Sequence, residues 1–157
     1  MIRVKLFFCA DSAVIDGTRN TISAFHILEQ ALAASFPTVI PRISIIGSFS
    51  REVTDPDTAD LTLTGVLAGR QIFSGPFRVL FFQQLAARAV LELQGIIVTT
   101  PGDLVFRLLY GQEELAIWSI PIIASPQAQT VQMYFGVPPQ SQPSGGRSTT
   151  PSETAAP

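Results

Sequence analysis

PGDLVFRLLYGQEELAIWSIPI, residues 101–122, has the sequence pattern of a β-hairpin. Leu104, Phe106 and Leu108 occupy alternate positions, so an extended strand places their three side chains on one face. Gly111 lies in the segment that would reverse the chain, and apolar residues resume directly after it. This stretch therefore predicts two adjacent antiparallel strands.

Short apolar or alternating runs also occur along most of the chain before this hairpin. They lie at residues 2–9, 20–28, 43–49, 60–67, 71–73, 77–82 and 89–93. The run 2–9 begins with alternating charged and apolar residues and then becomes continuously apolar. That change predicts a strand that starts half-exposed and becomes buried on both faces.

Turn signals and strand breakers separate these runs. Asp11–Ser12 is expected to end the first strand, and the turn at Asp16-Gly17 lets residues 14–15 pair with residues 20–28. Gly75-Pro76 is expected to interrupt a strand. The two helix-favouring patches are too short for stable helices, and they are 29–35 and 83–89.

The number of short strands and the lack of a long amphipathic helix predict an all-β fold. We expect an antiparallel β-sandwich of seven to nine short strands over residues 1–136, with a barrel as the main alternative. Residues 131–135 are either a last strand or the end of the ordered region. Residues 137–157 are rich in Pro, Ser and Thr and contain no aromatic residue, so they are predicted to be a disordered tail.

The composition limits the partners and the compartment that we expect. Hydrophobic residues make up 46% of the chain. Charged residues make up only 14%, whereas they make up about a quarter of an average domain. This balance indicates a large core, a covered face or self-association. The net charge of −2 does not indicate binding to nucleic acid, which favours basic proteins. We read neither a signal peptide nor a membrane span, so we expect a cytoplasmic protein without a membrane partner.

His26 is the only histidine of the chain, and it lies within the apolar run TISAFHIL. A histidine can act as a general base or as a metal ligand. The simpler interpretation is an ordinary strand residue, because no second ligand type accompanies it. No GxSxG or comparable nucleophile motif supports a Ser-His-Asp triad.

Cys9 and one aspartate-rich loop are the other candidates for chemistry. Cys9 follows an apolar strand, which favours a buried and inert thiol over a reactive one. As the only cysteine it allows neither an intramolecular disulfide nor a multi-cysteine zinc site. Asp55, Asp57 and Asp60 could hold Ca²⁺, but their spacing is not that of an EF-hand, and aspartates are common loop residues. We predict no catalytic residue, no metal site and no cofactor.

The aromatic residues mostly alternate with aliphatic ones, as core residues of a sheet do. Trp118 needs separate consideration because its place depends on whether a second sheet covers its face. If that face is covered, Trp118 is a core residue. If it is open, Trp118 and Tyr110 are the candidate contact residues of an interaction surface.

The order of motifs resembles that of a bacterial family known only as a domain of unknown function. The matching features are an apolar strand ending at Cys9 and Asp11, the turn at Asp16-Gly17, the strand that begins at Asn20, and the late hairpin. Members of that family have a Cys-Asp motif at the first strand and a Gly-x-Tyr-x-Phe hairpin near the end. Here Ala10 separates the Cys from the Asp. The resemblance covers roughly residues 1–123 and implies an all-β domain with no known activity.

Three functions follow from these observations. The first is a non-catalytic, cytoplasmic β-sandwich that binds another protein or itself. The second is a Ca²⁺-dependent module that binds a ligand or a membrane through the aspartate loops. The third is a hydrolase built around His26. The first explains the low charge and the lack of a catalytic constellation, so it is the function that the sequence favours.

Overall fold

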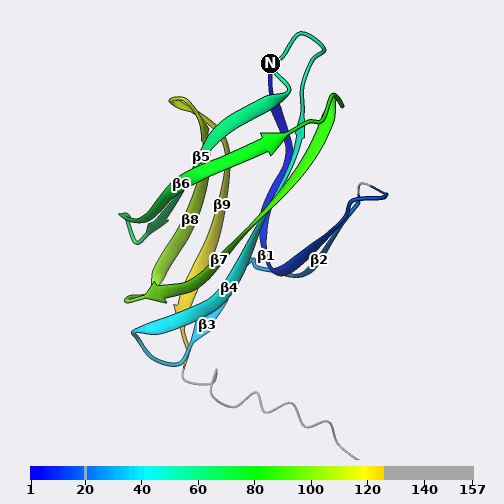
Figure 1. The fold of residues 1–157 in the computed structure, drawn as a ribbon. Helices are drawn as coiled ribbons and strands as arrows, with labels where there is room; N and C mark the ends of the chain where they lie inside the picture. The colour runs from blue at the N-terminus through cyan, green and yellow to red at the C-terminus, as the bar shows by residue number, and fades with distance from the viewer. Residues whose placement is uncertain (20, 126–157) are drawn as a thin grey trace, which may run out of the picture.

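The computed structural model describes residues 1–19 and 21–125, and all regular structure in these ranges is β-strand (Figure 1). The predicted tail, the predicted domain boundary and the candidate strand at residues 131–135 lie outside the described residues. The strands are β1 (Arg3–Asp16), β2 (Thr21–Ile27), β3 (Ala31–Ala33), β4 (Thr38–Ser50), β5 (Thr58–Leu67), β6 (Arg70–Leu80), β7 (Ala86–Val98), β8 (Gly102–Tyr110) and β9 (Glu113–Ala124).

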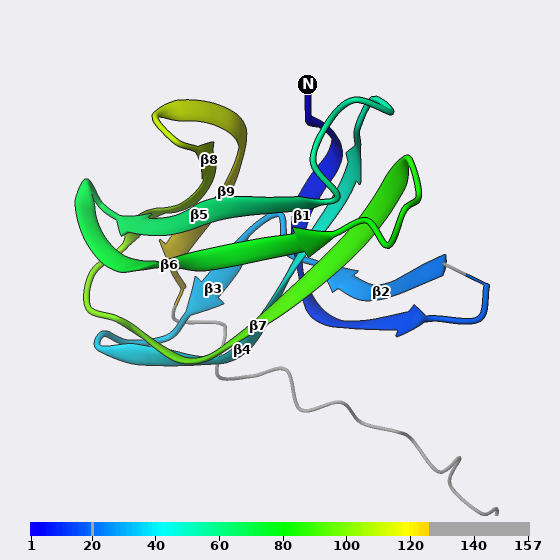
Figure 2. The same ribbon diagram turned by 45° about the horizontal axis from the view of Figure 1, so that its top comes forward.

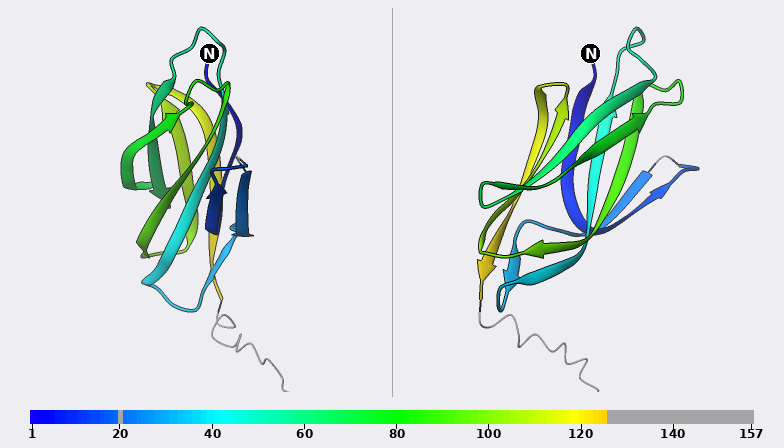
Figure 3. Two further views of the ribbon diagram at one scale, coloured as in Figure 1. Left: turned by 45° about the vertical axis from the view of Figure 1, so that its right-hand side comes forward. Right: turned by 60° about the vertical axis from the view of Figure 1, so that its left-hand side comes forward.

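The strands form two sheets that pack face to face (Figures 2 and 3). The first sheet has the order β2-β1-β4-β7, and the second has the order β3-β9-β8-β5-β6. All strand pairs are antiparallel except β3 with β9, which is parallel. The predicted all-β sandwich is confirmed, and its one parallel pair involves only three residues of β3.

The predicted hairpin at residues 101–122 is confirmed as β8 and β9. Leu104, Phe106 and Leu108 are all buried, and they lie opposite Ile120, Trp118 and Ala116 of β9. These buried residues occur at every second position because one face of the second sheet packs on the core and alternate side chains of a strand point to that face. The main core joins these residues to inward-facing side chains of the first sheet, such as Ile43, Ile45 and Phe49.

The first strand becomes buried on both faces, as the sequence predicted. Phe7 and Cys9 belong to the main core, while Phe8 and Ala10 belong to a second cluster with Ile46 of β4. Alternate residues of a strand point to opposite faces, so the two clusters lie on opposite faces of β1. Side chains of the β1–β2 hairpin pack against the second cluster, and they are Ala13, Ile22 and Ala24.

The prediction that Asp11–Ser12 ends the first strand is wrong. β1 continues to Asp16, but its partner changes near Ala10 from β4 to β2. Ser12 and the residues that follow it pair with β2 as far as Thr21. The polar residues therefore mark the place where β1 leaves β4, and Figure 1 shows the resulting β1–β2 hairpin projecting from the body.

One further expectation about local structure is corrected. Gly75-Pro76 does not interrupt a strand, because β6 runs unbroken through both residues. β6 is the end strand of its sheet, so it has a side on which a missing N–H removes no ladder hydrogen bond. The first helix-favouring patch contains β3, whose three residues pair with Ile122–Ala124. Tertiary pairing thus overrides a helix preference that is too short to nucleate.

Candidate functional site

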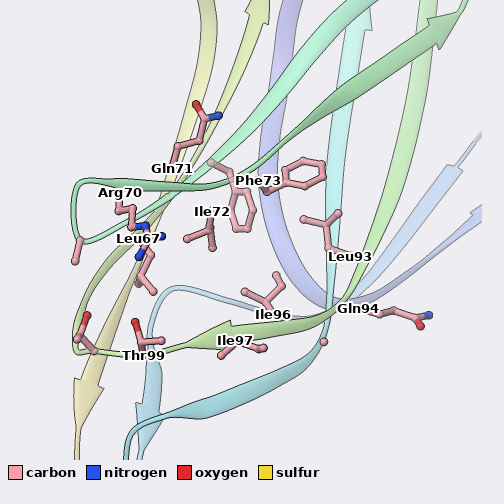
Figure 4. A pocket seen from close by; sticks show the side chains of 14 residues that line it. Leu67, Arg70, Gln71, Ile72, Phe73, Leu93, Gln94, Ile96, Ile97 and Thr99 are labelled. Carbon is pink, nitrogen blue, oxygen red and sulfur yellow. The ribbon is translucent and has the colours of Figure 1, made fainter.

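A cleft of about 870 Å³ lies between β6 and β7 (Figure 4). β7 is an end strand of the first sheet and β6 is an end strand of the second. The two strands therefore form one open side of the sandwich, where they diverge (Figure 2). Clefts of this volume are within the usual range for binding sites.

The β6 wall of the cleft is shaped by a break in strand register. Gly65 of β5 pairs with Phe73, but the next residue, Val66, pairs with Gln71. Ile72 is thus the extra residue of a β-bulge, which leaves it without an opposite residue and redirects its side chain. Ile72 is 40% exposed and lines the cleft beside Phe73.

The β7 wall is shaped by Gly95, whose φ of 67° lies in the left-handed region. Before this glycine, Leu91 and Leu93 face the core; after it, Ile96 and Val98 do. The inward alternation therefore shifts by one residue at Gly95. As a result Leu93 and Ile96, which are three positions apart, both line the cleft.

The floor of the cleft consists of core residues. Leu67 is 3% exposed and Phe106 is 1% exposed, and both line it. Figure 4 shows Ile72 and Ile96 reaching into the space between the two strands from opposite sides. The interior of the cleft is therefore aliphatic and aromatic, and it is continuous with the main core.

Polar side chains lie along the cleft without forming a catalytic arrangement. Arg70 is the only ionisable residue among those that line it, and the others with polar side chains are Gln71, Gln94, Thr99 and Thr100. General acid–base catalysis requires a titratable group in reach of the reacting atoms. The lining of this cleft supplies apolar contacts, amide and hydroxyl hydrogen bonds, and a single cation.

The backbones of β6 and β7 add a second kind of binding capacity. Among the strands of residues 1–19 and 21–125, each of the two has a ladder partner on one side only, β5 for β6 and β4 for β7. A free strand edge presents N–H and C=O groups that can pair with an added strand. The cleft thus combines an apolar interior with free backbone edges at both walls.

His26 does not belong to this cleft. It lies in β2 with a φ of 54° and a side chain that is 84% exposed, and its Nδ1 is 3.3 Å from Oδ2 of Asp11. This pair joins opposite positions at the base of the β1–β2 hairpin. The predicted strand position is confirmed, but the side chain faces solvent and pairs with a carboxylate.

Cys9 is fully buried in the main core, as the sequence predicted. Burial raises the pKa of its thiol, because the thiolate would lose its hydration there. The thiol is therefore held in its neutral form, which is neither a nucleophile nor a metal ligand.

The three aspartates proposed for Ca²⁺ each face a different cationic partner. The Asp55 carboxylate binds the N-terminal ammonium of Met1, Asp57 accepts from Arg51 at 2.8 Å, and Asp60 accepts from Arg78 at 2.5 Å. Within residues 1–19 and 21–125, no group of three candidate ligands is close enough to hold a metal ion. This geometry favours the role of loop residues.

The surroundings of Asp55 favour the charged form of its carboxyl group. Hydrogen bonds from the Met1 ammonium, and then from the backbone N–H of Glu52 at 2.7 Å, hold its pKa below the ordinary value of 3.8. Hydrogen bonding to the charged form of a carboxyl group lowers its pKa. Asp55 therefore fixes the loop that follows β4 to the start of the chain.

The two candidate contact residues of the sequence lie in different environments. Trp118 is half-buried. Its ring packs edge-on against the ring of Phe8, with the two ring centroids 6.3 Å apart. Its Nε1 donates to the carbonyl oxygen of Leu28 at 2.9 Å. Tyr110 is 42% exposed at the end of β8. The structure thus places Trp118 between the hairpin base and the sandwich and leaves Tyr110 open to solvent. Their role as contact residues remains a prediction.

The cleft itself was missed by the sequence interpretation. Its walls come from strands that are separated by the turn at residues 81–85. Neither the bulge at Ile72 nor the shifted alternation at Gly95 has a strong composition signal. The local signal was Gly95 between Leu93 and Ile96, where a simple alternation would have required an apolar residue one position earlier. A glycine within a strand pattern is a known sign of a local irregularity, and here it marks a shift in alternation while the pairing of β7 with β4 keeps its register.

No family model and no curated protein matches this chain. Among solved structures, an immunoglobulin-like protein from Pseudomonas aeruginosa is similar, with 14% sequence identity and a TM-score of 0.41. The match covers 78% of this chain and 97% of that chain. The two-sheet fold described above rests on the strand pairing of this chain, and membership of the bacterial family remains a prediction. No helix within the described ranges is long and apolar enough to cross a membrane.

Proposed function

We propose that this chain is a non-catalytic, cytoplasmic β-sandwich protein that binds an extended segment of another polypeptide at the cleft between β6 and β7. The observation that carries the proposal is that an apolar cleft lies between the end strands of two sheets. A bound segment could pair its backbone with one edge and insert alternate side chains between the walls. This mode of recognition is strand addition.

The chemistry of the lining supports binding over catalysis. Arg70 is its only charge, and it offers no carboxylate, imidazole or thiol. Neither a nucleic acid nor an anionic membrane surface is favoured by a single cation in an apolar cleft. The expected ligand is a segment with alternating apolar side chains and little charge.

The exposed position of Ile72 provides a direct test. A library of random extended peptides displayed on phage is selected on the full chain, and the affinity of a selected peptide is then measured for three proteins. These are the wild type, Ile72→Asp and Leu80→Asp. Ile72 and Leu80 lie on the same strand with similar exposure, 40% and 44%, but only Ile72 lines the cleft.

Ile72→Asp should weaken the selected peptide by at least tenfold, because it places a charge inside the apolar cleft. Leu80→Asp should leave the affinity unchanged within about twofold, because its side chain is outside the cleft. Equal affinities for all three proteins would mean that peptides bind elsewhere, and the proposal would then be wrong.

A further inference from the structure

Arg70 lies at the end of the cleft where the turn between β5 and β6 meets the start of β8. It follows directly on that two-residue turn, since Leu67 pairs with Arg70. The backbone N–H of Ala68, within the turn, donates to the carbonyl oxygen of Asp103 at 3.1 Å. The turn that carries Arg70 is therefore fixed beside the connection that leads from β7 to β8.

Two hydroxyl groups belong to the same end of the cleft. Thr99 and Thr100 lie in the connection between β7 and β8, and both line the cleft together with Arg70. Figure 4 shows Arg70 and Thr99 near the turn, whereas Ile72 reaches into the cleft further along β6. Guanidinium and hydroxyl groups can donate hydrogen bonds to a carboxylate. This end of the cleft is therefore suited to an anion, and the remainder is suited to apolar side chains.

The guanidinium of Arg70 has no carboxylate within ion-pair distance among residues 1–19 and 21–125. Four other arginines in these ranges do bind a carboxylate of their own chain, and they are Arg3, Arg51, Arg78 and Arg107. A cation at the end of an apolar cleft is complementary to a ligand that carries one negative group beside apolar groups. The charge of the cleft therefore favours a ligand with a single carboxylate.

The cleft is closed beyond Arg70 by the chain itself. β7 belongs to the first sheet and β8 to the second, so residues 99–101 cross from one sheet to the other. The hydrogen bond between Ala68 and Asp103 joins this crossing to the β5–β6 turn. A polypeptide in the cleft would therefore end or bend away near Arg70. A C-terminal carboxylate at that point is attracted by the guanidinium, whereas an N-terminal ammonium is repelled by it.

The position of Arg70 also sets the direction of a strand that is added to β6. β6 begins at Arg70 and runs away from this end of the cleft. A segment whose last residue lies at Arg70 is antiparallel to β6, which is the more stable kind of pairing. Ile72 and Phe73 line the cleft two and three positions after Arg70, which corresponds to roughly 7–10 Å of strand. The apolar side chains of the ligand should therefore come from its last few residues.

We propose that the cleft binds the C-terminal segment of another protein, with the terminal carboxylate on Arg70 and apolar side chains between Ile72 on β6 and Ile96 on β7. This inference rests on the proposed function and names the class of ligand that the same site would take. The planar guanidinium binds both carboxylate oxygens, and the hydroxyl of Thr99 or Thr100 supplies a further donor. Arg70 is then a specificity-determining residue, because it selects a free chain end over an internal segment.

A pair of peptides that differ only at the C-terminus tests the proposal. A library displayed on phage with free C-termini is selected on the full chain, and one selected sequence is synthesised both as the C-terminal acid and as the C-terminal amide. The wild type should bind the acid about tenfold more tightly than the amide, because the amide carries no charge for the guanidinium to bind. This difference should shrink as salt is added, since Arg70 is exposed.

Variants of Arg70 assign the effect to its side chain. Arg70→Gln should bind the acid about tenfold more weakly than the wild type does. It should bind the amide with wild-type affinity, which also shows that the cleft of the variant is still folded. Arg70→Lys should keep part of the preference for the acid, because an ammonium group retains the charge but not the bidentate geometry.

Arg78→Gln is the matched control for these variants. Arg78 lies on the same strand as Arg70, but it is outside the cleft lining and pairs with Asp60. Arg78→Gln should therefore bind the acid and the amide with wild-type affinities.

Two results would overturn the inference. In the first, the wild type binds the acid and the amide equally. In the second, Arg70→Gln keeps the full preference for the acid, so that Arg70 does not bind the chain end. The proposed function survives either result if Ile72→Asp still weakens the selected peptide relative to Leu80→Asp, and it falls if that effect is also absent.

Discussion

The indole nitrogen of Trp118 lies 2.9 Å from the carbonyl oxygen of Leu28, so a side chain of the second sheet holds the backbone that leaves the β1–β2 hairpin. The N–H of the same Leu28 donates to the carbonyl oxygen of Cys9 at 2.9 Å. One residue thus ties the end of the hairpin to β1 and to β9. The edge-on contact between the rings of Trp118 and Phe8 strengthens the same connection.

Trp118→Phe should lower the free energy of unfolding by about 1 kcal/mol, because it removes the donor for a partly buried carbonyl group while keeping an aromatic ring. Urea denaturation measures this change, and hydrogen exchange should accelerate in β2 more than in β5. Tyr110→Phe is the matched control, since Tyr110 is 42% exposed, and it should stay within about 0.5 kcal/mol of the wild type. Equal stability of the two variants would contradict a structural role for the indole N–H.

The thiol of Cys9 should not react with an Ellman-type reagent in the native protein between pH 7 and pH 9. Its side chain is fully buried, and burial raises the pKa of the thiol. Raising the pH within this range therefore produces no thiolate until the protein unfolds. Labelling should become complete in concentrated urea. Native labelling at the rate of a free thiol would show that β1 opens far more readily than its burial implies.

The stabilising contribution of Asp55 should be lost in acid. Its pKa is lower in the folded chain than the ordinary value of 3.8, because the Met1 ammonium and the Glu52 N–H bind its charged form. Its contribution is therefore fully present above pH 3.8 and is lost as the pH falls through the lower, folded pKa. Melting temperatures measured from pH 6 to pH 2 should separate wild type from Asp55→Asn at the upper end, and the two should converge at the lower end.

Asp60→Asn is the control for this pH series. Asp60 pairs with Arg78 through side chains that are both largely exposed, and such surface pairs contribute little. Asp60→Asn should therefore melt close to the wild type at pH 6. If Asp55→Asn and Asp60→Asn behaved alike over the whole range, the binding of the Met1 ammonium by Asp55 would not matter for stability.

The parts of the fold that the sequence predicted correctly depend on neighbouring segments. Leu104, Phe106 and Leu108 share a face because strand alternation is a local property, and β9 returns beside β8 through a short turn. The prediction that Gly75-Pro76 interrupts a strand was wrong because it depended on distant segments. A proline is excluded from a strand interior only when both edges are paired, and the place of β6 at the end of its sheet depends on the whole topology.

The candidate site depended still more on distant contacts. Ile72 and Ile96 face one another only because the end strands of two different sheets meet on one side of the sandwich. Trp118 in the same way finds its acceptor 90 positions away, at Leu28. Periodicity shows that a side chain points to one face of a strand, but it does not show which strand covers that face.

Gly95 offers the last test, because its backbone conformation shapes the β7 wall of the cleft. A Cβ at this position would meet no atom within 4 Å, but the φ of 67° is unfavourable for a residue with a side chain. Gly95→Ala should therefore lower the free energy of unfolding by about 1–2 kcal/mol. Gly95→Asn should cost less, since Asn adopts left-handed conformations more readily. Gly17→Ala is the control, because Gly17 also has open space around it but is not in the left-handed region.

The same variants should affect the cleft in the same order. If Gly95→Ala relieves its strain by leaving the left-handed region, the alternation of β7 is no longer shifted, and Leu93 and Ile96 no longer lie together on the wall. The peptide selected on the wild type should then bind Gly95→Ala more weakly than Gly95→Asn, while Gly17→Ala keeps full affinity. A Gly95→Ala protein with wild-type stability and affinity would show that the shift in β7 does not depend on the left-handed glycine.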